Sequence, residues 1–321
     1  RTSTLALPDT PEYATWGEVA PDRRGGGDVW IAGSYDPDLD LVYFGTSQPK
    51  PWAAPSRGMS VNDAALYTNS TLALRPQTGE LVWYFQHIPG ETIDMEVGFE
   101  RILADIDGTP TLLTVGKDGI LWKLNRATGA YIDLLDTMEQ TIFEVDRSTG
   151  EIAYREDIAS AGIGDTYTAC PGIYGGHNWQ SATFDASRNL LFLPVHQLCS
   201  DMTPREVDLG PGGGGYGADV ATYPMPGKEG KAGALLAIDV RTMEVKWRVE
   251  QEALFLSGAL STDGGLLFIG DLDRRFQAFD TETGELRWST RLPAPAHGYP
   301  ITFEAGAKQY VAIPAGIGVF R

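Results

Sequence analysis

The chain is poor in the residues that build metal and haem centres. Its 321 residues include only two cysteines and four histidines. Two cysteines cannot form a structural zinc site, and no Cys-x-x-Cys-His motif for covalent haem is present. The histidines are scattered without ligand spacing, which favours structural roles for all four; they are His87, His177, His196 and His297.

Positive charge is also scarce. Lysine and arginine total 25 against 43 acidic residues, which gives a net charge of −18. The average field of such a chain repels phosphate, so nucleic acid and anionic membranes are excluded as expected partners. No apolar run approaches the length of a membrane span. The chain begins at Arg1 without a charged-then-apolar leader, so no signal indicates its localisation.

The two cysteines, Cys170 and Cys199, allow two interpretations. They are either buried free thiols or a disulfide. They stand 29 positions apart. A disulfide closing a loop of that length would contribute about 3–4 kcal/mol to stability and would indicate an oxidising compartment.

Short phrases ending in Thr-Gly, or in a variant of it, recur along the chain, and several are followed four residues later by tryptophan. Apolar runs of strand length lie between them, and few stretches have helical periodicity. The phrases end at Gly79 (then Trp83), Gly129, Gly150, Met243 (then Trp247) and Gly284 (then Trp288).

A repeat of about 40–50 residues made of short strands is typical of propeller blades. A tryptophan at a fixed place in each repeat suits docking between neighbouring blades. A β-sandwich also alternates strands and turns, but it would not repeat one phrase at this period. The sequence therefore predicts an all-β propeller.

The segment 87–96 carries three carboxylates within six positions: Glu91, Asp94 and Glu96. It follows the strand-like run 81–85, and Pro89-Gly90 indicates a turn. Crowded carboxylates need a cation among them or must retain a proton. A solvated acidic loop is the simpler explanation, and the residues elsewhere decide between the two.

Several stretches, taken in order, resemble the catalytic propeller of quinoprotein alcohol dehydrogenases, the relatives of methanol dehydrogenase that use pyrroloquinoline quinone (PQQ). The resemblance runs from about Trp16 to the C-terminus. Its phrases are Gly25-Gly26-Gly27-Asp28-Val29-Trp30, Tyr43 to Trp52, Leu66 to Ser70, the acidic segment, Gly116-Lys117-Asp118-Gly119, Cys170-Pro171, Gly176-His177-Asn178-Trp179 and Cys199.

The resemblance implies an eight-bladed β-propeller with PQQ near its axis. Residues 1–321 would then form a partial propeller of about five to six blades, a single PQQ-binding catalytic domain without the N-terminal blades. The upstream part of the family carries a vicinal disulfide and a glutamate metal ligand, and neither is present in this sequence. Cys170 and Cys199 match a family disulfide of the same spacing.

The resemblance also assigns roles. Trp30 matches the indole on which the quinone stacks, and the preceding glycines permit close approach to the backbone. Asp94 matches the base that takes the alcohol proton while hydride passes to the C5 carbonyl of PQQ. Lys117 matches the cation that hydrogen-bonds the quinone oxygens. Asn178 and Trp179 match residues that contact the edge of the cofactor.

The implied metal is Ca²⁺ or a lanthanide ion held by hard oxygen ligands. Gln48 stands where the family has an asparagine ligand, one methylene shorter, and Asp94 lies near the metal. Glu96 falls where lanthanide-using members carry an extra aspartate, so it either supports a trivalent metal or is solvated. Leu256 replaces a tryptophan of methanol dehydrogenases, which either widens the pocket or repacks a blade.

The expected activity is oxidation of primary alcohols or polyols, with electrons passed to a separate cytochrome c, because this chain has no haem motif. The resemblance and the implied disulfide predict a periplasmic protein. Two alternatives stay open: a non-catalytic propeller scaffold like the outer-membrane assembly lipoprotein, and a quinoprotein that has lost activity.

Overall fold

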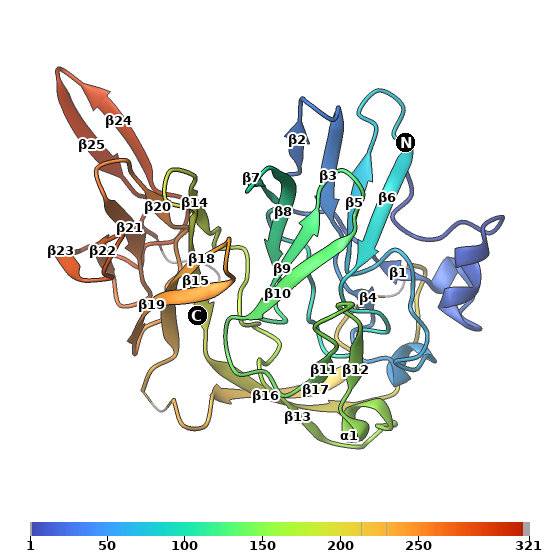
Figure 1. The fold of residues 1–321 in the computed structure, drawn as a ribbon. Coiled ribbons are helices and arrows are strands. Elements are labelled where there is room, and N and C mark those ends of the chain that lie inside the picture. The colour runs from blue at the N-terminus through green and yellow to red at the C-terminus, as the bar shows by residue number, and fades with distance from the viewer. Residues whose placement is uncertain (1, 213, 229, 317–321) are drawn as a thin grey trace. The chain divides into compact units, whose positions relative to one another are not determined.

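The computed structural model describes residues 2–212, 214–228 and 230–316. Almost all regular structure is antiparallel β (Figure 1). The chain divides into two compact units, Arg1–Gly176 with Leu198–Tyr223, and His177–Gln197 with Pro224–Arg321. Each unit is described by itself.

The first unit contains two four-stranded antiparallel sheets whose strands follow one another as meanders. One sheet has the order β2 (Ser34–Asp36), β3 (Leu41–Gly45), β5 (Ser70–Leu74) and β6 (Leu81–Gln86). The other consists of β7 (Ile102–Ile106), β8 (Thr109–Val115), β9 (Ile120–Asn125) and β10 (Tyr131–Asp136).

Smaller elements complete this unit. Its shorter sheets are β1 (Gly25–Gly26) with β4 (Pro49–Lys50), β11 (Phe143–Val145) with β12 (Ile152–Tyr154), and β13 (Tyr167–Ala169) with β16 (Leu198–Pro204) and β17 (Ala218–Pro224). The helices are short: η1 (Pro11–Trp16), η2 (Pro21–Arg23), η3 (Pro55–Arg57) and α1 (Glu156–Ala159).

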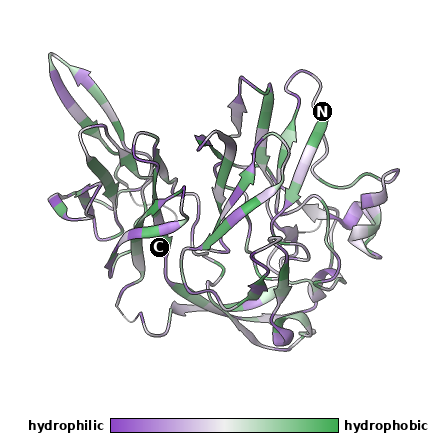
Figure 2. Cartoon of the chain, in the orientation of Figure 1, coloured by the Kyte–Doolittle hydropathy of each residue, from purple (hydrophilic) through white to green (hydrophobic). Residues whose placement is uncertain are grey.

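The second unit repeats the four-stranded pattern twice. Its first sheet has the order β14 (Thr183–Asp185), β15 (Leu190–His196), β18 (Gly233–Asp239) and β19 (Glu244–Gln251). The next has β20 (Leu260–Ser261), β21 (Leu266–Gly270), β22 (Arg275–Asp280) and β23 (Leu286–Arg291), and a hairpin follows, β24 (Ile301–Ala305) with β25 (Lys308–Ala312). Figure 2 shows hydrophobic and hydrophilic residues mixed along this hairpin.

The Thr-Gly turns join neighbouring sheets as the repeat predicts. Gly129 has a φ of 75°, and a Cβ there would lie 2.5 Å from the Trp83 ring. Gly284 has a φ of 72°, and a Cβ there would lie 2.8 Å from the ring of Trp247. A turn glycine is therefore required twice over, by its left-handed backbone and by the aromatic ring that lies against it.

Candidate active site

The candidate site is built on loops that follow two strand ends of the first unit. Asp94 and Glu96 lie on the segment after β6, and Lys117 lies on the turn between β8 and β9. Lys117 donates its main-chain N–H to the Glu96 carbonyl at 2.9 Å, which aligns the two loops. A side chain at Gly116 would collide with that same carbonyl, so the glycine permits the close approach.

A buried ion-pair network occupies the centre of the site. Lys117 Nζ lies 2.7 Å from Asp94 Oδ2 and 2.9 Å from Glu96 Oε1, and all three side chains are buried. Glu96 Oε2 also accepts a hydrogen bond from Trp30 Nε1 at 3.1 Å. The structure thus brings four of the predicted residues together, and the acidic segment is not a solvated loop.

The charges of the network set its protonation. Burial raises the pKa of Asp94 well above its usual value, the Lys117 ammonium opposes this rise, and the Glu96 carboxylate adds to it. Burial alone would lower the pKa of Lys117, but the two carboxylates outweigh it and raise that pKa. Lys117 therefore stays an ammonium, and Asp94 is a stronger base than an ordinary aspartate.

Asp94 is placed by an unusual backbone. Its φ is 127°, a conformation that residues other than glycine rarely adopt. Its Oδ1 atom is buried and has no hydrogen-bond partner, while Oδ2 faces Lys117. One carboxylate oxygen is thus committed to the ammonium, and the other is left to accept a proton or to bind a cation.

Trp30 differs from its neighbours in exposure. Its indole is 45% exposed, while its N–H edge is held by Glu96 and Phe99 contacts it edge-on at 5.4 Å between ring centroids. An aromatic face fixed at one edge and open elsewhere suits stacking of a flat ligand. The glycines before it have a packing explanation, because Gly26 lies directly against the main chain of Gln48.

Gln48 lies on the adjoining loop between β3 and β4. It is buried, and its Oε1 atom has no hydrogen-bond partner. Beside it, the main-chain carbonyl of Ser47 accepts a hydrogen bond from the Asn69 N–H at 3.0 Å. Asn69 Oδ1 in turn accepts a hydrogen bond from the Val97 N–H at 3.3 Å. Asn69 therefore links the Gln48 loop to the acidic segment, a role that its sequence phrase did not reveal.

These oxygens can be tested against the expected cation. Among the described residues, no group of three or more His, Cys, Asp and Glu side chains is arranged to hold a metal ion. However, the buried Oε1 of Gln48 and Oδ1 of Asp94 lack partners, and both are hard oxygen donors. Unpaired buried oxygens are costly without a ligand, so the donor set fits a hard cation.

Asn178 and Trp179 belong to the second unit. Asn178 is buried, and its Oδ1 accepts the Trp179 N–H at 2.8 Å. The Trp179 ring contacts His297 edge-on at 4.5 Å. Leu256 lies in the same unit, buried and hydrogen-bonded through its N–H to Gly270. The roles given to Asn178 and Trp179 stay predictions.

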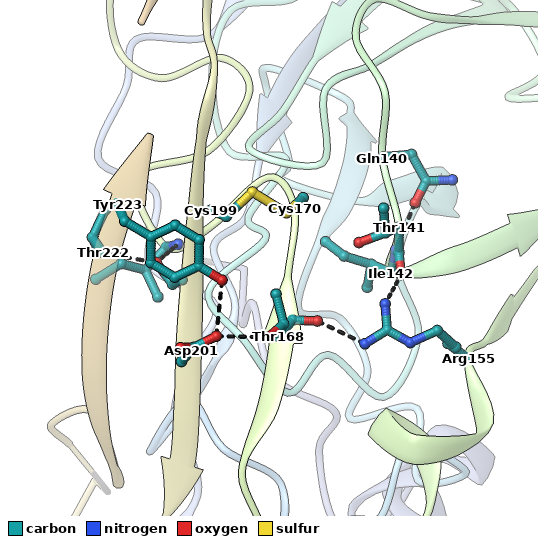
Figure 3. The surroundings of a disulfide bond; sticks show 12 residues. Gln140, Thr141, Ile142, Arg155, Thr168, Cys170, Cys199, Asp201, Thr222 and Tyr223 are labelled. Carbon is teal, nitrogen blue, oxygen red and sulfur yellow. Dashed lines mark hydrogen bonds between the residues drawn. A yellow bond between two sulfur atoms is a disulfide. The ribbon is translucent and has the colours of Figure 1, made fainter. Parts of the chain in front are cut away.

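The disulfide between Cys170 and Cys199 is confirmed (Figure 3). It joins the end of β13 to β16, two strands that also pair through the ladder. Beside it, Asp201 accepts hydrogen bonds from Thr168 at 2.6 Å and from Tyr223 at 2.9 Å. The bridge therefore adds a covalent link to a sheet that hydrogen bonds also hold together.

Comparison with known proteins identifies the family. The glucose/ethanol/alcohol dehydrogenase β-propeller domain, a PQQ family, matches residues 6–155 and 225–311. The chain belongs to this family of quinoprotein propellers, which confirms the predicted fold class and family resemblance.

Among characterised relatives, a quinohemoprotein alcohol dehydrogenase of Pseudomonas putida is 30% identical over 95% of this chain and 45% of its own length. A lanthanide-dependent methanol dehydrogenase of Methylorubrum extorquens is 31% identical over 99% of this chain and 55% of its own length. The solved structure of a europium-containing methanol dehydrogenase has a TM-score of 0.85 at 30% identity and covers 96% of this chain and 56% of that one. The chain thus spans about half the length of the relatives it matches.

Proposed function

We propose that this chain carries the catalytic site of a PQQ-dependent alcohol dehydrogenase that oxidises primary alcohols or polyols. The observation that carries the proposal is the buried network of Asp94, Lys117 and Glu96 beside the open face of Trp30. A scaffold has no use for a buried network of two carboxylates on one ammonium with an unpartnered carboxylate oxygen, because such an arrangement is costly without a ligand. The relatives are named as alcohol and methanol dehydrogenases, which also supports an enzyme over a scaffold.

The chain's own residues divide the work. PQQ, when bound, would accept hydride from the alcohol carbon. Trp30 would support a flat ring on its open face, and the Lys117 ammonium would stabilise negative charge on an adjacent oxygen. Asp94 Oδ1 would accept the hydroxyl proton, for which its raised pKa suits it. Asn178 and Trp179 would contact the edge of the ring system.

The same residues would hold a Ca²⁺ or lanthanide ion. Gln48 would contribute its amide oxygen, and Asp94 and Glu96 would contribute carboxylate oxygens. A trivalent ion favours more anionic ligands, so Glu96 is the residue that would favour a lanthanide.

The setting of the enzyme follows from the family and the disulfide. We propose that residues 1–321 form part of a larger propeller domain whose remaining blades complete the cofactor site. The disulfide supports a periplasmic location, and in the part of the chain that the structure describes no helix is long and apolar enough to cross a membrane. A separate cytochrome c is the proposed electron acceptor, in line with the naming of a related methanol dehydrogenase subunit.

The test is turnover of a series of primary alcohols and polyols with an artificial dye acceptor, after loading with PQQ and either CaCl₂ or LaCl₃. Asp94→Asn should reduce turnover about 10²- to 10⁴-fold, the usual contribution of a general base. Asp36→Asn is the matched control, because Asp36 is also a buried aspartate paired with a cation, Arg126, at 2.5 Å. Turnover that survives Asp94→Asn would remove Asp94 from the role of base.

A further inference from the structure

Two buried charges of the first unit lie outside the network of Asp94, Glu96 and Lys117. Arg57, at the end of η3, and Glu91, the first carboxylate of the acidic segment, are only 2% and 1% exposed. Burial lowers the pKa of Arg57 to about 10, and the nearby Glu91 carboxylate opposes this. Isolated buried charges are expensive, so each needs a compensating arrangement.

Arg57 donates hydrogen bonds to main-chain carbonyls. Nη1 donates to Pro51 O at 2.9 Å and to Trp52 O at 2.6 Å, and Nη2 donates to Glu91 O. One planar guanidinium thus joins the loop that carries Trp52 to the loop that carries Asp94. Arginine suits this role because its guanidinium presents N–H donors in a rigid planar fork.

Glu91 organises the loop from inside. Its Oε1 atom accepts hydrogen bonds from three main-chain N–H groups, those of Ile93, Asp94 and Met95, at 2.6, 2.7 and 2.9 Å. The middle donor belongs to Asp94, whose backbone has the rare positive φ. Hydrogen bonds to an ionised carboxylate are about twice as strong as neutral ones, so this cluster can hold a strained turn in place.

Both loops deliver a side chain to Lys117. Asp94 Oδ2 lies 2.7 Å from Nζ, and the Trp52 ring, stacked on Tyr216 at 4.2 Å, has its centroid 5.9 Å from the same atom. We propose that Arg57 and Glu91 form a buried positioning pair that fixes the Asp94 carboxylate and the Trp52 indole relative to Lys117. Its kinetic part rests on the proposed function; its structural part does not.

Glu91→Gln tests the pair with little change of shape, because the amide keeps one acceptor oxygen, removes the charge and places an NH2 group where the second carboxylate oxygen stood. Arg57→Lys is the second variant, because lysine keeps the charge but lacks the planar fork whose two nitrogens reach the carbonyls of both loops. Arg126→Gln is the control: Arg126 is buried and ion-paired with Asp36, and it also donates to Ala104 O at 2.6 Å, so its loss should lower stability alone.

The first readout needs no cofactor. In a ¹H–¹⁵N spectrum of the tryptophan indoles, with the signals of Trp30 and Trp52 assigned by Trp30→Phe and Trp52→Phe, both test variants should shift the Trp52 signal. The control variant should leave that signal where it is in the wild type. Indole signals that stay unchanged in both folded variants would overturn the proposal, whether or not the chain turns over alcohols.

The second readout is kinetic. Glu91→Gln should lower kcat about 10-fold with little change in KM, since a small misplacement of a catalytic group mainly costs rate. Arg126→Gln should lower Tm and leave kcat unchanged. Wild-type protein without turnover would overturn the proposed function alone, because the indole signals still test the pair. Turnover with kcat equal in wild type and both test variants would overturn the pair alone.

Discussion

Trp247 and Trp288 occupy the same place in successive repeats but have different surroundings. Trp247, on β19, packs on Gly284 of the next turn and donates its N–H to Thr281 O at 3.0 Å. Trp288, on β23, is 49% exposed. It borders a hollow of about 490 Å³ with Leu266, Phe268 and Val311. The burial of a docking aromatic is therefore set by the following repeat, not by its own strand.

The sheet that bears the acidic segment differs from the sheet that contains Trp288 in the same way. The sheet β2-β3-β5-β6 has its aromatic, Trp83, almost completely buried, and the acidic segment leaves this sheet at the end of β6. A covered sheet gives the segment a rigid base, which catalytic groups require. The sheet β20-β21-β22-β23, whose last strand is exposed, carries no such cluster of buried charge among its described residues.

The largest effect is expected at the almost completely buried Trp83. Trp83→Ala should lower the free energy of unfolding by about 3–5 kcal/mol, because it removes a large ring from a packed interface. Urea denaturation at constant pH measures the change. A loss below about 1 kcal/mol would mean that the ring does not hold neighbouring sheets together.

Acidification provides the next test, because His196 lies buried in β15 of a covered sheet, with Nε2 3.2 Å from Phe255 O. Burial lowers the pKa of His196 to about 3. Between its usual pKa near 6.5 and about 3, the unfolded chain binds a proton that the folded chain does not. The free energy of unfolding should fall by about 1.4 kcal/mol per pH unit across this window from this group.

Stability measured by denaturation at several pH values checks this slope. In His196→Gln it should be smaller by the amount assigned to one histidine. An unchanged slope would show that His196 does not contribute to the acid sensitivity.

The turn glycine should matter less than the ring it supports. Gly284→Ala should cost about 1–3 kcal/mol, because its Cβ would collide with Trp247 and its φ is 72°. Gly306→Ala is the matched control: its φ is 56°, and a Cβ there meets nothing within 4 Å. Equal losses in the two variants, measured by thermal denaturation, would reduce the glycine requirement to backbone conformation alone.

The smallest effect is expected at the uncovered aromatic. Trp288→Ala should change the free energy of unfolding of this chain by less than about 1 kcal/mol, because exposed positions lose little packing. The same urea experiment measures it. A loss as large as that of Trp83→Ala would contradict the comparison.

Much of the fold could be predicted because a short sequence phrase, repeated along the chain, determines the turns and the strands beside them. The Thr-Gly turns and the strands around them appear where the spacing places them, since positive φ, strand length and an aromatic at a fixed offset are all local properties. What could not be predicted is which aromatic is covered. Trp247 and Trp288 share one phrase, and only the presence of a neighbouring turn distinguishes them.

The site could be predicted in part for the same reason. Asp94, Glu96 and Lys117 stand in recognisable phrases, but the hydrogen bonds that place them include long-range ones. Arg57 donates a hydrogen bond to the main-chain carbonyl of Glu91, 34 residues away. Every residue has such a carbonyl, so the sequence gives no sign of this contact. Glu91 itself was visible as one of three acids, and only the structure shows that its carboxylate faces inward toward the loop.

The most direct test of the central claim is equilibrium binding of PQQ to the purified chain, followed by quenching of tryptophan fluorescence with and without Ca²⁺ or La³⁺. The account predicts saturable one-to-one binding that requires the metal and weakens at least 10-fold in Trp30→Ala, while Trp288→Ala, an equally exposed tryptophan, binds as wild type does. Binding that ignores both the metal and Trp30 would contradict it.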